Sequence, residues 1–190
     1  MERRRPMELA PEKFKQFFPL PVTVITTRDG RGVANAAPYS CVMPILRPYP
    51  LIALASALPR HTLQNIRETG QFVVNVIGRP SFRDAMRTAR PYPPDVDELE
   101  RVGLETVPSK RVSPPRIAAA IGWVEATLER EVTDERYALL VGRILCSEIN
   151  DRYLEDGRLK ELPLTLLAPH FRMLGDVLAD REELESELTL

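Results

Sequence analysis

Short apolar runs rich in β-branched residues follow one another along most of the chain, with turn residues between them. Such runs are typical of β-strands, and they predict strands at residues 22–27, 33–45, 51–57, 71–78, 121–132 and 137–149. Asp29 and Gly30, between the first two runs, form a dipeptide typical of a hairpin turn. Strands joined mostly by hairpins favour a mainly β fold, an antiparallel barrel with a few peripheral helices, over a doubly wound sheet.

Helical periodicity is confined to short segments. Short helices are predicted at residues 11–18, 62–70 and 81–90. In the second of these, Thr62 is expected to cap the start and Gly70 to end the helix in the left-handed conformation. Prolines predict a loop at residues 90–98. Residues 169–178 are expected to close the core, and residues 179–190 to form an acidic helical tail.

Composition restricts the class of protein. The chain has 190 residues, 44% of them hydrophobic, which predicts one domain over residues 1–190 with its core at about 20–178. A net charge of -1 gives no overall attraction to nucleic acid or to an anionic membrane. The longest apolar run, residues 51–58, is far shorter than the roughly 20 residues of a membrane span, and no secretory signal is recognised. Two cysteines make no disulfide framework, so we expect reduced thiols in the cytoplasm.

Several common catalytic motifs are missing from the sequence. It has no phosphate loop, no G-x-S-x-G motif and no H-E-x-x-H motif, and its two histidines fit no recognisable zinc spacing. Residues 30–32 begin like a dinucleotide fingerprint, but Asn35 stands at the third glycine position and Pro38 follows where a helix should run. The sequence therefore predicts neither a metal site nor a dinucleotide-binding domain.

Residues 35–40, N-A-A-P-Y-S, interrupt a predicted strand with a proline and small side chains. Proline cannot donate a hydrogen bond to a strand ladder, so it belongs at an edge or a bulge. Two interpretations follow. Either the segment is such an edge or bulge, or something other than a side chain occupies the space that the small residues leave.

A second segment, residues 56–66, combines polar side chains with the expected start of a helix. The positive end of a helix dipole and its free N–H groups attract anions. A plausible anion site is therefore formed by Ser56, Arg60, His61 and Thr62. A simpler interpretation stays open, in which these are only a small core residue, loop residues and a helix cap.

The order of these segments resembles the flavin reductase-like family of FMN-binding split-barrel proteins, to which flavoredoxin belongs. The motifs are P-x-x-V-x-V-I-T-T, N-A-A-P-Y-S, R-H-T-L-x-N-I, G-x-F-V-V-N and L-L-V-G-R-I, over roughly residues 21–178. The resemblance implies an antiparallel split β-barrel in which the second motif lines FMN, through Asn35, Ala36, Ala37, Pro38, Tyr39 and Ser40. It implies that the ribityl chain and phosphate are held by Ser56, Arg60, His61, Thr62 and Asn65.

The same resemblance implies an oxidoreductase that passes a hydride from NADH or NADPH to FMN and electrons onward to an unknown acceptor. The flavin supplies the chemistry, so no catalytic side chain is assigned. One alternative is an FMN-binding electron carrier reduced by a protein partner, without turnover of NAD(P)H. Another is an apo barrel, empty or holding a different phosphate compound such as a pyridoxal derivative.

Family members also suggest a homodimer, in which Phe171 and Arg172 contact the flavin of the partner chain. One position departs from the family pattern. Many members have a histidine near the flavin, five residues before the strand glycine, and Tyr137 stands there in this chain. Cys41 follows the flavin-lining motif and is expected to face the core.

Overall fold

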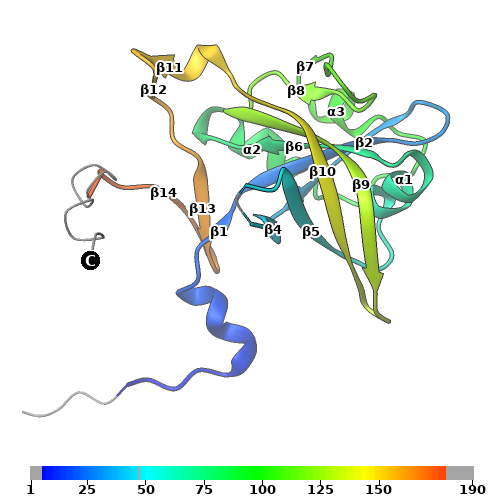
Figure 1. Ribbon diagram of the computed structural model, residues 1–190. Helices are drawn as coiled ribbons and strands as arrows, with labels where there is room; N and C mark the ends of the chain where they lie inside the picture. Colours follow the sequence, from blue (N-terminus) through cyan, green and yellow to red (C-terminus); the bar gives the residue numbers. More distant parts are fainter. Residues whose placement is uncertain (1–5, 47, 179–190) are drawn as a thin grey trace, which may run out of the picture.

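A seven-stranded antiparallel sheet forms the body of the molecule (Figure 1). The computed structural model describes residues 6–46 and 48–178. The strands follow one another in the order β3 (Ala34–Tyr39), β2 (Thr23–Arg28), β6 (Gln71–Val76), β9 (Gly122–Thr133), β10 (Tyr137–Ile149), β5 (Leu51–Ala57) and β4 (Val42–Pro44). All neighbours pair antiparallel. The predicted antiparallel class is confirmed, and the run at residues 33–45 divides into two strands, β3 and β4.

The sheet curls into a split barrel because its two edge strands are almost consecutive in the chain. β3 and β4 stand at opposite ends of the strand order, yet only Ser40 and Cys41 separate them. The carbonyl of Cys41 accepts a hydrogen bond from the N–H of Ala55 on β5, at 3.0 Å. Pro38 therefore lies on an edge strand, where a missing N–H is tolerated. The edge interpretation of the N-A-A-P-Y-S segment is confirmed.

Helix α1 (His61–Thr69) follows β5 and contributes to the barrel core. Its Leu63 and Ile66 are buried in one cluster with Phe72 of β6 and Leu140 of β10. Gly70 ends the helix with φ 69°, in the left-handed conformation, as expected. The predicted cap was wrong by two positions, because the extended residue before the helix is Arg60 and it makes no side-chain capping bond.

Two shorter helices, α2 (Phe82–Arg87) and α3 (Glu98–Val102), lie against β3. They bury Ala85 and Leu99 in a second cluster, with Val24 and Ala36 of the sheet. The sequence predicted residues 90–98 as a loop, and α3, which begins at the last of them, was missed. The carboxylate of Asp97 caps α3 by accepting hydrogen bonds from the N–H groups of Leu99 and Glu100. Three 3₁₀ segments span Pro11–Gln16, Arg79–Ser81 and Asp151–Tyr153.

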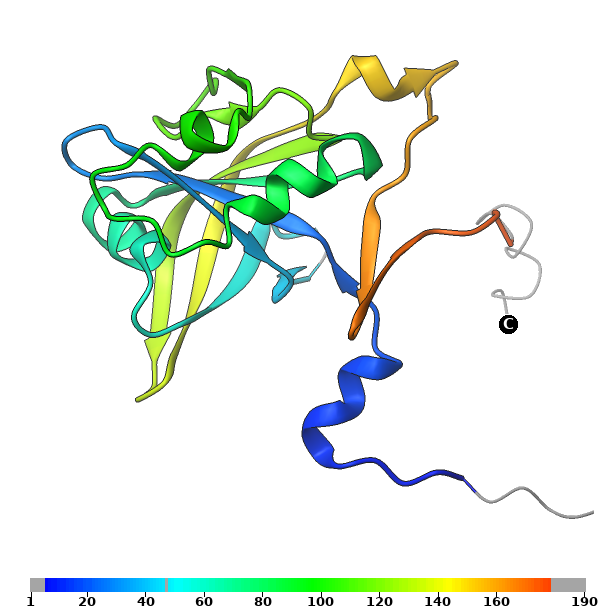
Figure 2. The same ribbon diagram turned by 180° about the vertical axis from the view of Figure 1, so that it is seen from behind.

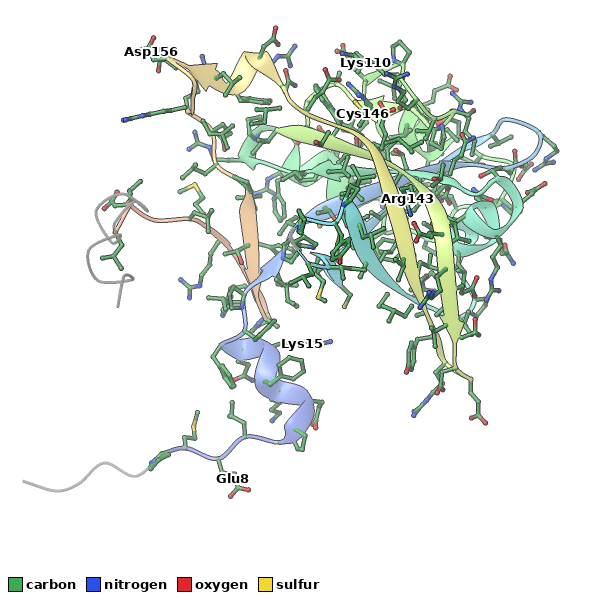
Figure 3. The ribbon with its side chains drawn as sticks, viewed as in Figure 1. Glu8, Lys15, Lys110, Arg143, Cys146 and Asp156 are labelled. Atoms are coloured by element: carbon green, nitrogen blue, oxygen red, sulfur yellow. The ribbon has the colours of Figure 1, made fainter. Side chains whose placement is uncertain are left out.

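Both ends of the described chain extend away from the barrel (Figures 1 and 2). A small sheet joins β1 (Leu20–Pro21), β13 (Leu164–Leu167) and β14 (His170–Met173) in that order. Figure 3 shows Glu8 and Lys15 on the N-terminal part of this extension, outside the barrel. We call residues 6–18 and 169–178 the arms.

The C-terminal arm corrects one expectation. Residues 169–178 were predicted to close the core, but all four positions of β14 are exposed, because β14 pairs only with β13. The predicted helical tail at residues 179–190 lies outside the described residues. Two further hairpins pair β7 (Thr106–Val107) with β8 (Arg116–Ile117), and β11 (Leu154–Glu155) with β12 (Arg158–Leu159).

The cysteines and the lengths of the helices bear on the cellular environment that the sequence predicts. Cys41 and Cys146 are both free thiols, as predicted. Within residues 6–46 and 48–178, no helix is long and apolar enough to cross a membrane.

Candidate functional site

A cleft of about 830 Å³ opens along the edge strand β3. Volumes of about 300–1,000 Å³ are typical of small-molecule sites. Five parts of the chain line the cleft: β3 with the two residues after it, the end of β5, the start of α1 with the two residues before it, the loop at residues 88–92, and Glu98 at the start of α3. Of the thirteen predicted site residues, those that line it are Asn35, Ala37, Pro38, Tyr39, Ser40, Arg60, His61 and Thr62.

The start of α1 has the properties of an anion site. His61 and Thr62 are the first two helical residues, and both line the cleft beside Arg60. Because no side chain caps this helix, its first N–H groups have no capping partner and are free to bind an anion. The error in the predicted cap therefore favours the anion interpretation over the capping one.

Small side chains on β3 and β5 line the cleft and leave its space open. Ala37 on β3 and Ala55 and Ala57 on β5 all line it. Between them the phenol of Tyr39 meets the hydroxyl of Ser56, with 2.8 Å between the two oxygens. Ser56 is 1% exposed and does not line the cleft, so its role in the structure is to fix the ring of Tyr39.

A buried polar cluster forms the floor of the cleft. The N–H of Ala36 donates to the Glu98 carboxylate at 3.0 Å, and the amide of Asn35 lies 3.0 Å from Thr62 Oγ1. Glu98 is 5% exposed. Burial raises the pKa of the Glu98 carboxyl to about 7; the Ala36 hydrogen bond opposes this rise and the charge of Asp97 adds to it. A carboxyl group that changes charge near neutral pH thus stands next to the anion site.

The other predicted residues lie outside this cleft. Ala36 lies on β3 but is fully buried. Asn65 donates to the Thr27 hydroxyl at 3.0 Å and lines an adjoining cavity of about 40 Å³. Phe171 and Arg172 lie on exposed β14, where the ring of Phe171 packs against Phe82 with 4.8 Å between ring centroids. Their predicted contact with the flavin of a partner chain stays a prediction.

Two further positions can now be placed. Cys41 was expected to face the core, and this is wrong: it is exposed and lines the cleft, because the chain crosses there from one barrel edge to the other. Tyr137 pairs in register with Ala57, a cleft residue, but its own 49% exposed side chain does not line the cleft.

The sequence did not predict some residues that line the cleft, among them two from the loop at residues 88–92 and one from α3. Arg90 and Tyr92 come from the proline-rich loop, and Glu98 comes from the start of α3. The aromatic and cationic residues among the prolines were a usable signal for the loop. Glu98 carried no local signal, because only the fold brings it against β3, 62 residues away from Ala36 in the chain. Across the described part of the chain, no group of three or more His, Cys, Asp or Glu residues could hold a metal ion.

Comparisons with known proteins agree with this architecture. An uncharacterized protein of Methanothermobacter thermautotrophicus is 43% identical over 154 residues, which are 77% of this chain and 73% of that protein. Flavoredoxin from Methanosarcina acetivorans has a similar structure, with a TM-score of 0.82 and 19% identity over 98% of this chain and 100% of that one. The NADH:FAD oxidoreductase of Streptomyces globisporus C-1027 has a TM-score of 0.76 and 18% identity over 90% and 100%. The sequence model of the flavin reductase like domain matches residues 15–175, and the chain therefore belongs to that family.

Proposed function

We propose that this protein binds FMN in the cleft along β3 and acts as an NAD(P)H-dependent flavin oxidoreductase. The observation that carries the proposal is the meeting of an uncapped helix start with a wall of small residues in one cleft. The helix start suits the phosphate, and the small residues suit a flat ring. The family to which the chain belongs supports a flavin as the ligand.

The residues present fit such a ligand. Arg60, His61 and Thr62 would hold the phosphate, because they combine a guanidinium, an imidazole and a hydroxyl with the free N–H groups of α1. Ala37, Pro38 and Tyr39 would face the ring, with Asn35 and Ser40 at either end of that wall. Ser56 and Ala36 would support this wall from behind, and Asn65 would do so for α1.

A bound flavin would supply hydride and electron transfer, and the protein would supply orientation and electrostatics. The similar NADH:FAD oxidoreductase supports a nicotinamide nucleotide as the donor. We propose FMN as the flavin because the sequence motifs resemble those of FMN-binding split-barrel proteins. We assign no catalytic side chain. The electron acceptor is a separate partner whose chemistry the cleft does not specify.

The second candidate function is an FMN-binding electron carrier reduced by a protein partner. Tyr137 favours it, because it stands where many family members have a histidine near the flavin. The similarity to a flavoredoxin is compatible with either function. Reduction by NADH or NADPH separates the two.

Two further proposals complete this function. We propose a homodimer, which the exposed apolar arms support, and within it Phe171 and Arg172 would reach the flavin of the partner. We also propose one domain that works in the cytoplasm, where its two thiols would stay reduced.

The first experiment is a visible absorption spectrum of the protein, recorded after adding FMN and then NADH or NADPH under nitrogen. Flavin peaks that shift on binding and bleach with the nucleotide are the expected result. If the flavin peaks shift on binding but do not bleach with the nucleotide, and bleach only when a protein electron donor is added, the result would favour the electron carrier. No shift with FMN would reject a flavin site and leave a fold that holds another phosphate compound or none.

A pair of arginine variants locates the site. Arg60→Ala should weaken FMN binding about 10- to 150-fold, because a charge-assisted hydrogen bond contributes on the order of 1.5–3 kcal/mol. Arg83→Ala is the matched control, since Arg83 is exposed on α2 and does not line the cleft. Equal affinities of the two variants would place the phosphate elsewhere.

A further inference from the structure

Glu98 is an unexpected residue in a cleft that suits an anion. It is 5% exposed, it begins α3, and it lines both the main cleft and the small adjoining cavity. An ionised carboxylate at this place repels a phosphate, since burial weakens solvent screening. The cleft can hold a phosphate beside Glu98 only if the charge of the Glu98 carboxylate is removed or kept away from the phosphate.

The side chain of Asn35 connects Glu98 to the anion site through Thr62. In one orientation of the Asn35 amide, Nδ2 donates to Thr62 Oγ1 at 3.0 Å and lies 3.1 Å from the Ala36 nitrogen. The amide oxygen then faces Glu98 Oε1 at 3.3 Å, a contact that requires a proton on the carboxyl. In the opposite orientation, Nδ2 donates to Glu98 Oε1 at 3.3 Å, and the oxygen accepts from the Thr62 hydroxyl at 3.0 Å and from the Ala36 N–H at 3.1 Å. Each orientation fits one charge state of Glu98.

An ionised carboxylate only accepts hydrogen bonds, so it requires the orientation in which Asn35 donates to it. The Thr62 proton then points at the Asn35 oxygen and is not available to a ligand. A protonated Glu98 donates to the Asn35 oxygen instead, and Asn35 donates to Thr62. The Thr62 proton is then free to donate into the cleft, beside the N–H groups of the helix start.

We propose that Glu98, Asn35 and Thr62 form a proton-controlled relay that sets the affinity of the cleft for the phosphate of its ligand. In the protonated state the relay offers one more donor and no negative charge, and in the ionised state it removes the donor and adds the charge. The inference deepens the proposed function, because it rests on a phosphate-bearing ligand at α1. Glu98 and Asn35 act through Thr62, so they are positioning residues.

The charged groups around Glu98 determine where the relay changes state. Its own helix contributes Asp97, whose charge raises the pKa of Glu98. The small cavity adds Asp29 from the β2–β3 turn, and His61 lines both cavities with Glu98. The cations of the main cleft are Arg60 and Arg90. Burial and the charge of Asp97 favour the protonated carboxyl, and a bound phosphate would favour it further, so phosphate binding and proton uptake are linked.

The test compares FMN with riboflavin, which lacks the phosphate. Affinities are measured by flavin fluorescence from about pH 7 to about pH 8.5, where a phosphate with a second pKa near 6 keeps a nearly constant charge. We expect the affinity for FMN to fall about fivefold over this range and that for riboflavin to stay constant. Calorimetry in buffers of different ionisation enthalpy should show proton uptake on FMN binding.

Glu98→Gln should abolish both effects. The glutamine carries no charge at any pH, and its NH₂ group can donate to Asn35 as the protonated carboxyl does. Glu100→Gln is the matched control, because Glu100 is exposed on the same helix and does not line the cleft, and it should behave like the wild type. Every variant keeps His61, so a difference between Glu98→Gln and the wild type reports on Glu98.

A second pair of variants covers the event that Glu98→Gln does not fold. Thr62→Ser keeps the hydroxyl and should retain the pH dependence of FMN binding, whereas Thr62→Val lacks it and should bind FMN weakly at every pH. A Thr62→Val protein with the full pH dependence would overturn the relay. So would a wild-type protein whose FMN affinity is constant and whose binding takes up no proton, while leaving the proposed FMN function intact.

Failure of the proposed function has a different signature. If the wild type binds no FMN at any pH, the relay is read in the protein alone, from the NMR signals of the Asn35 side-chain amide. Signals that shift between about pH 6 and about pH 8 in the wild type, but not in Glu98→Gln, would support the relay. Signals that do not move would overturn it.

Discussion

Among single side chains, that of Glu98 makes folding stability depend on pH. Its pKa rises from the ordinary value of 4.5 to about 7 in the folded protein. Between these values the folded state binds more protons than the unfolded state, so the free energy of unfolding falls as the pH rises from about 4.5 to about 7. Below this window both states are protonated and the stabilisation is fully present. We expect a loss of about 3 kcal/mol across it.

Urea unfolding of the wild type and of Glu98→Gln at several pH values measures this effect. The free energy of unfolding of the variant should gain on that of the wild type by about 3 kcal/mol as the pH rises through the window, because glutamine does not ionise. Glu100→Gln should follow the wild type. A constant difference between Glu98→Gln and the wild type would show that the Glu98 pKa is not raised.

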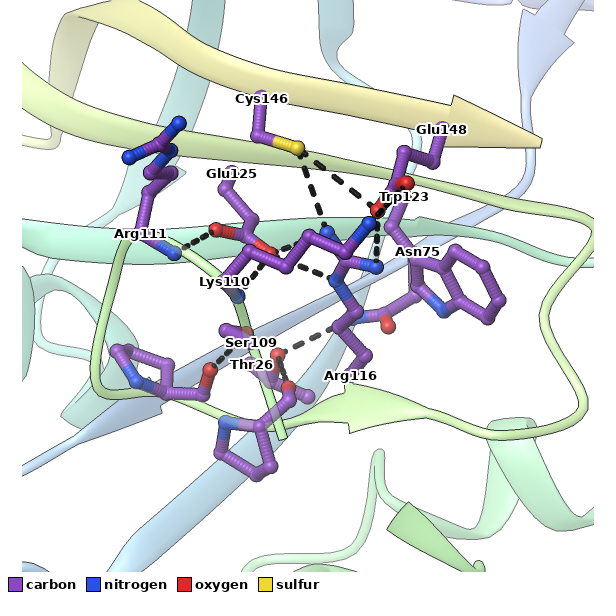
Figure 4. A network of polar contacts seen from close by, with 12 residues as sticks. Thr26, Asn75, Ser109, Lys110, Arg111, Arg116, Trp123, Glu125, Cys146 and Glu148 are labelled. Carbon is purple, nitrogen blue, oxygen red and sulfur yellow. Dashed lines mark hydrogen bonds and ion pairs between the residues drawn. The ribbon is translucent and has the colours of Figure 1, made fainter. Parts of the chain in front are cut away.

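A second buried side chain, Arg116, ties β8 to the main sheet (Figure 4). Arg116 is 4% exposed; its Nε donates to Glu125 Oε1 at 2.6 Å and its Nη1 to Glu148 Oε2 at 2.6 Å. The backbone N–H groups of Lys110 and Arg111 also donate to the Glu125 carboxylate, at 2.8 and 2.6 Å. Glu125 is fully buried, so its charge depends on these partners.

Arg116→Met should therefore lower the free energy of unfolding by about 3–5 kcal/mol, because it leaves the charge of Glu125 buried without its cation. Adding Glu125→Gln should recover part of the loss, since the two backbone donors still have an acceptor. Arg79→Met is the control: Arg79 forms an exposed pair with Glu161 at 3.9 Å, and its loss should cost about 1 kcal/mol or less. Equal costs in chemical denaturation would mean that the Arg116 pair is effectively solvated.

At the scale of elements, β10 packs tightly against the ring of Phe72 on β6, and Gly142 is the residue at this contact. A Cβ atom on Gly142 would lie 2.5 Å from Phe72 Cζ and 3.3 Å from Ala126 Cβ. Phe72 is fully buried, so the ring has no free space into which to move. Gly142→Ala should cost about 1–3 kcal/mol of unfolding free energy through overpacking.

Thermal and chemical unfolding of the double variant Gly142→Ala with Phe72→Leu tests the cause. The smaller side chain should make the added methyl less costly than it is beside Phe72. Gly175→Ala is the control, because nothing lies within 4 Å of a Cβ atom there. If Phe72→Leu gave no relief, the cost would come from the β10 backbone and not from the ring.

The sequence predicts an element well when neighbouring residues in the chain determine it, and poorly when contacts with distant segments do. β5 was placed with the bounds Leu51–Ala57, since a buried apolar run and its turn signals are local. The division between β3 and β4 was missed, because it follows from the closure of the barrel. The exposure of β14 was missed for a similar reason: its pattern resembles a core strand, and only its pairing with β13 removes it from the core.

The cleft shows the same distinction. Arg60, His61 and Thr62 were predicted because a helix start after a strand is a local pattern. Glu98 and Arg90 come from a stretch that was predicted as a loop, and they reach the cleft only through packing against β3. Two of the three causes that shift the Glu98 pKa, its burial and the hydrogen bond from the Ala36 N–H, are products of the fold, and only Asp97 is a neighbour in the sequence.

At the scale of the whole molecule, the two arms leave many large apolar side chains exposed to solvent. Large side chains that are more than two fifths exposed include Phe14, Phe17, Phe18, Phe171, Met173, Leu174 and Val177. Contiguous apolar surface on a folded protein marks an interaction site. The two arms begin close together, because the N–H of Ala168, the residue just before the C-terminal arm, donates to the Lys15 carbonyl at 2.9 Å. A second copy of the chain is the partner that we propose for this surface.

The expected result is a dimer, with a mass near twice 21.5 kDa in light scattering after size exclusion. Phe171→Glu combined with Met173→Glu places two charges on exposed β14 and should shift the protein toward monomer without unfolding it, because neither residue is buried. Val107→Glu, on exposed β7, is the control and should remain dimeric. If Phe171 also contacts the partner's flavin, FMN affinity should fall as the dimer dissociates on dilution. A β14 variant that stays dimeric would place the interface elsewhere, and a wild type that is monomeric at every concentration would remove the partner's residues from the site.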